Sequence, residues 1–242
     1  MRTVQFSVVM LCCFVLAALA APAAPVTGQT IPPDDSPRIL FAGNSLTYGR
    51  IHAEWPGGWG MAATEPDKDY VHRTQLLITA ATGRIPDVAI ASLDLNRDEY
   101  FAEAQRTADE FDADIAVIQM GDQAWALQED DYKARLRMIA GWFAPARLII
   151  TGSWYQTHCE RWNREVAAEL GATFVPLHDL YEPANWQRPD CEVPGGVCGH
   201  PGDRGMALIA ERVAAAILAP PPRLYVPWLV RQDAQDTAWP TW

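Results

Sequence analysis

The chain has 242 residues, a length that suits one α/β domain whose core is large enough to fold alone. Its hydrophobic content of 49% and charged content of 20% are typical of a globular protein and exclude wholesale disorder. A net charge of −11 argues against nucleic acid as a partner, because phosphate backbones bind clustered positive charge.

The N-terminal segment predicts a secretory signal peptide over residues 1–20. Arg2 supplies a short positive start, residues 8–20 are apolar and uncharged, and Ala18-Leu19-Ala20 has the small-x-small pattern of a cleavage site. The apolar run is shorter than the roughly 20 residues that a membrane-spanning helix needs, so we expect no stable membrane association. We therefore expect a secreted or periplasmic protein in which residues 21–36 form a disordered lead-in.

Residues 37–222 are expected to form one domain in which short apolar strands alternate with helical segments. The expected strands span 38–42, 88–91, 115–119, 147–151 and 173–176. The expected helices span 70–81, 98–111, 130–143, 160–170 and 201–218. This alternation predicts a three-layer α/β/α sandwich with a five-stranded parallel sheet. Residues 223–242 would form an aromatic C-terminal tail.

Polar residues that follow the predicted strands are the candidate site residues, because ligands of parallel α/β sheets bind at the carboxyl ends of the strands. They are Asn44-Ser45, Ser92, Asp122-Gln123 and Ser153-Trp154. The last connection of the chain, which ends at His200, can join them.

Ser45 is the candidate nucleophile. It lies in Gly43-Asn44-Ser45-Leu46-Thr47, directly after the first predicted strand, where a sharp strand-to-helix turn would expose its hydroxyl. The glycine tolerates the backbone geometry that such a turn requires. On this motif alone, an equal alternative is that Ser45 merely caps a helix.

A serine hydroxyl needs a neighbouring base, which is usually histidine. His200, in Gly199-His200-Pro201-Gly202-Asp203 at the mouth of the last predicted helix, is the candidate base. The competing histidines are His52, His72, His158 and His178. The first two lie in or near polar helical stretches typical of solvated residues, and the last follows a strand, as a structural histidine can.

Three blocks of the sequence resemble the SGNH/GDSL hydrolase superfamily, and the resemblance covers nearly all of the chain after the predicted signal peptide. Residues 39–47 are similar to its nucleophile block in the Gly-Asn-Ser-Leu-Thr variant. Residues 117–123 resemble the block that normally contains Gly-x-Asn-Asp, and residues 199–205 resemble the terminal histidine block. The resemblance implies the flavodoxin-like SGNH hydrolase fold and a serine esterase.

The resemblance also implies residue roles. Ser45 would attack an ester carbonyl, and His200 would take its proton and return it to the leaving alcohol. The oxyanion would be held by the Ser45 backbone N–H, by a backbone N–H near Ser92 and by the side-chain amide of Gln123. Serine replaces the usual glycine at 92, glutamine replaces the usual asparagine at 123, and Asn44 is assigned to substrate binding.

The third catalytic residue departs most from the family pattern. The acid normally lies three residues before the histidine, and that position here is Val197. Asp190 is the candidate acid and Glu192 an alternative, because either could fold back toward His200. Otherwise the enzyme would work as a Ser-His dyad whose imidazole is oriented by a backbone carbonyl.

Three cysteines lie beyond the predicted signal peptide: Cys159, Cys191 and Cys198. In an oxidising compartment we expect Cys191 and Cys198 to form a disulfide, with Cys159 left over and buried. The alternative pairs Cys159 with one of the other two. A Cys3His zinc site with His200 is a rival interpretation, but the spacing fits no zinc-finger pattern, so we expect no metal.

No cofactor is implied, because the sequence has no phosphate-binding glycine loop and no nicotinamide fingerprint. Trp55, Trp59 and Trp154 lie near candidate site residues and are assigned to substrate binding by stacking on sugar rings, although core packing is the commoner fate of tryptophan. The expected substrate is a small-molecule or carbohydrate ester. The rival functions are a catalytically degenerate carbohydrate-binding module and an O-acyltransferase that uses the same residues, and the oligomeric state stays open.

Overall fold

The computed structural model describes residues 36–50, 55, 57–187 and 197–221. The predicted signal peptide, almost all of the lead-in and the C-terminal tail lie outside the described residues and stay predictions. In the part of the chain that the structure describes, no helix is long and apolar enough to cross a membrane.

Five parallel strands form one sheet in the order β2-β1-β3-β4-β5. The strands are β1 (Arg38–Gly43), β2 (Asp87–Ser92), β3 (Ile115–Gln119), β4 (Arg147–Thr151) and β5 (Thr173–Val175). The order of the first three places β1 between β2 and β3, so the chain winds in opposite directions from β1. A crevice forms outside the strand ends at such a point of reversal.

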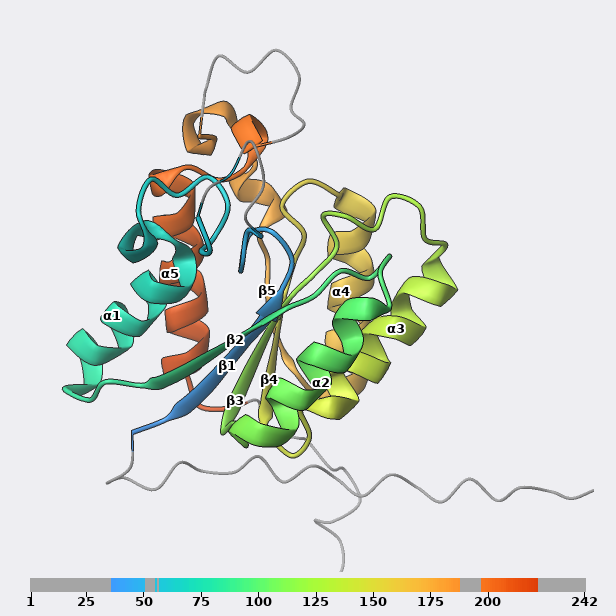
Figure 1. Cartoon of the computed structure of the whole chain (residues 1–242), viewed down its shortest axis with the longest axis horizontal. Coiled ribbons are helices and arrows are strands. Elements are labelled where there is room, and N and C mark those ends of the chain that lie inside the picture. The colour runs from blue at the N-terminus through green and yellow to red at the C-terminus, as the bar shows by residue number, and fades with distance from the viewer. Residues whose placement is uncertain (1–35, 51–54, 56, 188–196, 222–242) are drawn as a thin grey trace, which may run out of the picture.

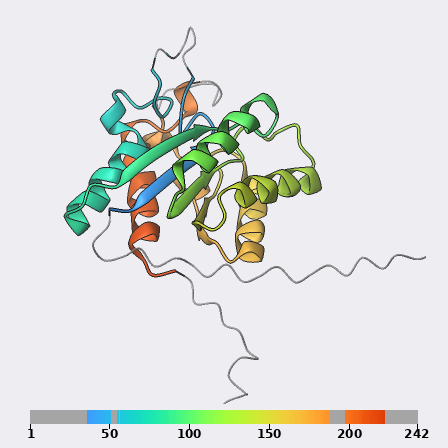
Figure 2. The ribbon, with the colours of Figure 1, turned by 60° about the horizontal axis from the view of Figure 1, so that its bottom comes forward.

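Helices cover both faces of the sheet (Figure 1). They are α1 (Tyr70–Thr82), α2 (Glu99–Phe111), α3 (Glu129–Trp142), α4 (Thr157–Leu170) and α5 (Asp203–Leu218). The helices α1 and α5 pack against one face, while α2, α3 and α4 cover the other, and Figure 2 shows the twisted sheet between the same two layers. The predicted three-layer α/β/α fold class is therefore confirmed.

Alternate residues along each strand enter two separate hydrophobic clusters, as the two-residue period of a strand requires. In β1, Ile39 and Phe41 face the cluster beneath α1 and α5, whereas Leu40 and Ala42 face the cluster beneath α2, α3 and α4. All four side chains are fully buried. This double burial explains why the strands are near-continuous apolar runs in the sequence.

Polar contacts fasten the amino-terminal ends of the strands, and we call this set the amino-edge clamp. The Asp114 carboxylate accepts the Arg38 N–H at 2.8 Å, and its carbonyl accepts the Arg147 N–H at 2.9 Å. The Arg147 guanidinium donates to the carbonyls of Ala216 and Ile217 in the last turn of α5, at 2.7 and 3.0 Å. These carbonyls lack partners within their own helix, so the clamp ties the end of α5 to the sheet.

Candidate active site

Ser45 lies in a tight turn directly after β1. The N–H groups of Thr47 and Tyr48 both donate to the Asn44 carbonyl at 2.9 Å, and residues 44–47 form a turn. The next described helical segment begins only at Pro66. The expectation of a strand-to-helix turn is therefore wrong, and so is the alternative that Ser45 caps a helix.

The turn requires glycine at position 43 because a side chain there would collide with neighbouring atoms, and not because the backbone adopts an unusual conformation. A Cβ atom there would lie 2.1 Å from the Thr47 hydroxyl oxygen and 2.7 Å from the Gln119 carbonyl oxygen. The turn is also held from the other side, because the Met61 N–H donates to the Ser45 carbonyl at 2.8 Å. The backbone of Ser45 is thus fixed both by the hydrogen bonds within its own turn and by the bond from Met61.

His200 meets Ser45 across the fold. The Ser45 Oγ and the His200 Nε2 are 2.9 Å apart, although 155 positions separate the residues in the chain. Both residues are 8% exposed. His200 is held by its backbone, since its N–H donates to the Val197 carbonyl at 3.1 Å and its carbonyl accepts the Gln187 N–H at 2.9 Å. The two residues that the sequence singles out for chemistry therefore lie within hydrogen-bond distance.

The other imidazole nitrogen of His200 contacts Tyr155, which is not among the predicted site residues. The Tyr155 hydroxyl oxygen lies 2.9 Å from the His200 Nδ1. Burial, with a smaller contribution from the Asp122 charge, raises the pKa of the Tyr155 phenol, so the phenol is neutral at physiological pH. Its position directly after Ser153-Trp154, in the loop that follows β4, is the signal by which the sequence could have indicated it.

The Asp122 carboxylate accepts three hydrogen bonds from residues near Ser45 and Tyr155. The residue is 7% exposed, and its carboxylate accepts hydrogen bonds from the Ser153 hydroxyl at 2.7 Å, the Tyr155 N–H at 2.9 Å and the Gln119 side-chain amide at 2.7 Å. A buried carboxylate requires such partners. Gln119 continues the network, because its Oε1 accepts from the Thr47 hydroxyl at 3.5 Å. The nucleophile turn and the Tyr155 loop are thereby connected through one buried polar network.

A pocket of about 250 Å³ opens at Ser45. Asn44, Ser92 and Gln123 line it together with Ser45, so the structure brings the predicted oxyanion-hole residues to one place. Within the described residues the Asn44 Nδ2 is buried without a hydrogen-bond partner. A buried amide donor is costly to leave unpaired.

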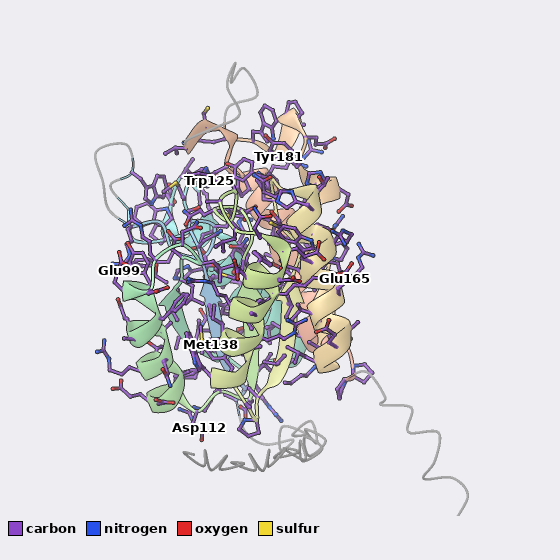
Figure 3. The ribbon with its side chains drawn as sticks, turned by 90° about the vertical axis from the view of Figure 1, so that its right-hand side faces the viewer. Glu99, Asp112, Trp125, Met138, Glu165 and Tyr181 are labelled. Atoms are coloured by element: carbon purple, nitrogen blue, oxygen red, sulfur yellow. The ribbon has the colours of Figure 1, made fainter. Side chains whose placement is uncertain are left out.

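Other lining residues of the pocket are not among the predicted site residues. Tyr48, Arg50 and Tyr100 line it, and the Arg50 guanidinium lies 4.0 Å from the centre of the Tyr100 ring. Trp125, two residues after Gln123, is 77% exposed. In Figure 3 Trp125 and Tyr181 both lie toward the same end of the molecule.

The prediction that three tryptophans stack on the substrate is wrong for two of them. Trp154 is fully buried, and its indole N–H donates to the Gly199 carbonyl at 3.0 Å. Trp55 is 6% exposed and packs edge to face on Trp59, with ring centroids 5.3 Å apart. Trp59 is half-buried and donates to the Ala63 carbonyl at 3.0 Å. Core packing, the commoner fate, prevails here.

Of the competing histidines, two have structural partners in the described residues. His72 lies 2.8 Å from the Asp69 carboxylate, whose hydrogen bond raises the pKa of the imidazole, and the His178 Nδ1 lies 3.1 Å from the Trp154 carbonyl. His158 is exposed and stacks edge to face on Trp162. His52 lies outside the described residues.

Cys159 is buried and free, so the alternative that pairs it with another cysteine is wrong. Burial raises the pKa of its thiol to about 12, which keeps the free thiol protonated at physiological pH. No metal-binding cluster occurs among the described residues. Cys191, Asp190 and Glu192 lie outside them, and the Cys191–Cys198 bridge and the acid at Asp190 stay predictions.

Comparison with known proteins gives no match to a family model and none to a curated protein. Solved structures do match. LAE5, an alpha/beta hydrolase enzyme from the metagenome of Lake Arreo in Spain, has a TM-score of 0.55 at 15% identity over 74% of this chain and 94% of that one. A candidate SGNH hydrolase from Slackia heliotrinireducens has a TM-score of 0.51 at 16% identity over 76% of this chain and 100% of that one. The chain has the SGNH hydrolase fold.

A third match adds a carbohydrate enzyme to the proteins that share the SGNH fold with this chain. A family two carbohydrate esterase from Clostridium thermocellum, solved in complex with cellohexaose, has a TM-score of 0.50 at 16% identity over 75% of this chain and 63% of that one. At these identities the SGNH fold is what the proteins share, and function has to be argued from the residues of this chain.

Proposed function

We propose that the protein hydrolyses carboxylic esters through an acyl-enzyme on Ser45. The observation that carries the proposal is the 2.9 Å contact between the Ser45 Oγ and the His200 Nε2. This contact lies at a pocket of about 250 Å³ that Ser45 lines. A serine at a rigid turn after a strand, bonded to a histidine beside a pocket, is the arrangement that activates an otherwise weak nucleophile.

The reaction that we propose follows the general logic of serine hydrolases. The Ser45 Oγ forms a bond to the ester carbonyl carbon while its proton passes to the His200 Nε2. The tetrahedral intermediate collapses, the bond to the leaving alcohol breaks, and the proton returns to the alcohol oxygen. Water then attacks the acyl-enzyme by the same steps, which releases the acid and restores Ser45.

The oxyanion of the intermediate needs hydrogen-bond donors near the carbonyl oxygen. We assign this role to the Ser45 N–H, to a backbone N–H near Ser92 and to the Gln123 amide. Asn44, which lines the same pocket, is assigned to substrate binding. All of these groups lie at or just after the carboxyl ends of three adjacent strands, β2, β1 and β3.

The test is hydrolysis of short and medium p-nitrophenyl esters by the wild type and by Ser45→Ala. We expect Ser45→Ala to lose at least about 10⁴-fold in kcat with its far-UV circular dichroism unchanged, because the acyl-enzyme cannot form. Ser36→Ala is the matched control, since Ser36 is exposed before β1, away from the carboxyl ends of the strands, and should retain full activity. A wild type that neither hydrolyses these esters nor reacts with a fluorophosphonate would contradict the proposal.

An acylated carbohydrate is the substrate class that we propose. Three aromatic side chains support it: Tyr48 and Tyr100 line the pocket, and Trp125, two residues after Gln123 in the chain, is exposed. Aromatic faces of this kind suit the apolar faces of sugar rings. The shared fold with a carbohydrate esterase is consistent with the same class.

Replacing Trp125 tests the substrate class. We expect Trp125→Ala to lower kcat/KM for an acetylated xylo-oligosaccharide about five- to tenfold more than for p-nitrophenyl acetate, because one stacking contact contributes about 1 kcal/mol. Met138→Ala removes an exposed apolar side chain from α3 well away from Trp125 and serves as the control (Figure 3). Equal losses on both substrates would mean that Trp125 does not bind sugar.

A further inference from the structure

We propose that Tyr155 is the positioning residue for His200, holding the imidazole in the tautomer that can accept the Ser45 proton. The proposal rests on the proposed esterase function. Its basis is geometric: the Tyr155 hydroxyl oxygen lies 2.9 Å from the His200 Nδ1, while the Nε2 of the same ring lies 2.9 Å from the Ser45 Oγ. The phenol therefore stands at the nitrogen that faces away from the nucleophile.

The tautomer matters because a neutral imidazole carries one proton on one of its two nitrogens. Only a ring with the proton on Nδ1 leaves the lone pair of Nε2 free to take the Ser45 proton. Which nitrogen carries the proton is set by the hydrogen bond that the other makes. An acceptor at Nδ1 selects the productive form, and the Tyr155 oxygen, with two lone pairs, can be that acceptor.

The Tyr155 oxygen can also accept a hydrogen bond from the charged form of the His200 imidazole. When His200 holds the Ser45 proton, both nitrogens are donors, and the Nδ1–H can keep its bond to the Tyr155 oxygen. Hydrogen bonds from a charged donor are stronger than neutral ones, so this bond strengthens as the proton is transferred. A phenylalanine ring at 155 would offer no acceptor in either state.

Tyr155 is itself firmly held, which a positioning residue requires. Its N–H donates to the buried Asp122 carboxylate at 2.9 Å, and its ring packs edge to face on Tyr181, with centroids 5.3 Å apart. The ring also meets the His200 ring edge to face at 5.6 Å. These contacts fix the phenol at the imidazole.

The first readout is the tautomer of His200 in the free enzyme, measured by long-range ¹H–¹⁵N NMR of the histidine rings. His200→Gln assigns the signals among the five histidines. We expect the wild type to carry the proton on Nδ1 and Tyr155→Phe to shift toward protonation on Nε2, the form that free imidazole side chains prefer. Tyr181→Phe removes the same hydroxyl from the neighbouring ring and should leave the tautomer unchanged.

The second readout is the kinetics of the same variants. We expect Tyr155→Phe to lower kcat about 10- to 100-fold with KM within about twofold, because the lost interaction acts on proton transfer and not on substrate binding. Tyr181→Phe should keep the wild-type kcat. Asp190→Asn and Glu192→Gln are measured alongside, since these carboxylates are the predicted acids.

The outcomes separate this proposal from the proposed function. A wild type without esterase activity whose tautomer still shifts in Tyr155→Phe would refute the esterase and support the positioning role. An unchanged tautomer in Tyr155→Phe would overturn the positioning role even if kcat fell. A shift seen in Asp190→Asn or Glu192→Gln but not in Tyr155→Phe would overturn it as well.

Discussion

The Ser45→Ala/His200→Gln double variant is expected to hydrolyse esters no more slowly than either single variant. The Ser45 Oγ and the His200 Nε2 are 2.9 Å apart and exchange one proton in the proposed reaction. Without the imidazole the hydroxyl is not activated, and without the hydroxyl the imidazole has no proton to take. Residues that act as such a unit give strongly non-additive losses, so each single change should cost about 10⁴- to 10⁶-fold in kcat and the second change almost nothing more.

The measurement is kcat for the wild type, both single variants and the double variant on one p-nitrophenyl ester. His158→Gln makes the same substitution at an exposed histidine and is expected to keep wild-type activity. If the logarithms of the two single losses added in the double variant, Ser45 and His200 would act independently, and the acyl-enzyme mechanism would have to be abandoned.

Asp122→Ala is expected to have the largest effect on stability. The substitution leaves three buried donors without their acceptor: the Ser153 hydroxyl, the Tyr155 N–H and the Gln119 amide. Removing one partner of a buried charged network costs about 3–5 kcal/mol. For a chain of this size that corresponds to a fall in Tm of roughly 6–20 °C.

Thermal unfolding followed by circular dichroism tests this expectation. Asp122→Asn keeps the size of the side chain and an acceptor oxygen, so we expect it to lose about 1–2 kcal/mol, mainly from the missing charge. Asp109→Ala removes an exposed carboxylate from α2 and should change stability by less than about 0.5 kcal/mol. An Asp122→Ala variant as stable as Asp109→Ala would mean that water replaces the carboxylate without cost.

The elements of the fold could be predicted from the sequence because alternate residues of the strands pack into hydrophobic clusters on opposite faces of the sheet. The expected strands at 115–119 and 147–151 match β3 and β4 in full, and the other strands differ by one residue at one or both ends. Glycine marks the ends of two helices correctly, since Gly83 and Gly171 both adopt the left-handed conformation there. These signals are local, which is why a single sequence carries them.

The site could be predicted only for the nucleophile and the base, because few residue types can perform those two roles. A serine after the first strand and a histidine before the last helix have few structural rivals, and the two side chains do meet. Tyr155 could not be assigned because its partnership with His200 depends on how the loop after β4 folds against the last connection. The same loop buries Trp154 beneath Gly199, where its indole N–H finds a carbonyl, and no pattern in the sequence distinguishes that fate from exposure at a cleft.

The amino-edge clamp has a consequence for how proteins of this design can diversify. Asp114 and Arg147 fasten strands and the last helix at one edge of the sheet, whereas Ser45 and the residues that line its pocket belong to the opposite edge. Loops at that opposite edge can therefore change in length and composition while the scaffold keeps its fastening. New specificities can be grafted onto this architecture, in nature or in the laboratory, by loop exchange without redesigning its core.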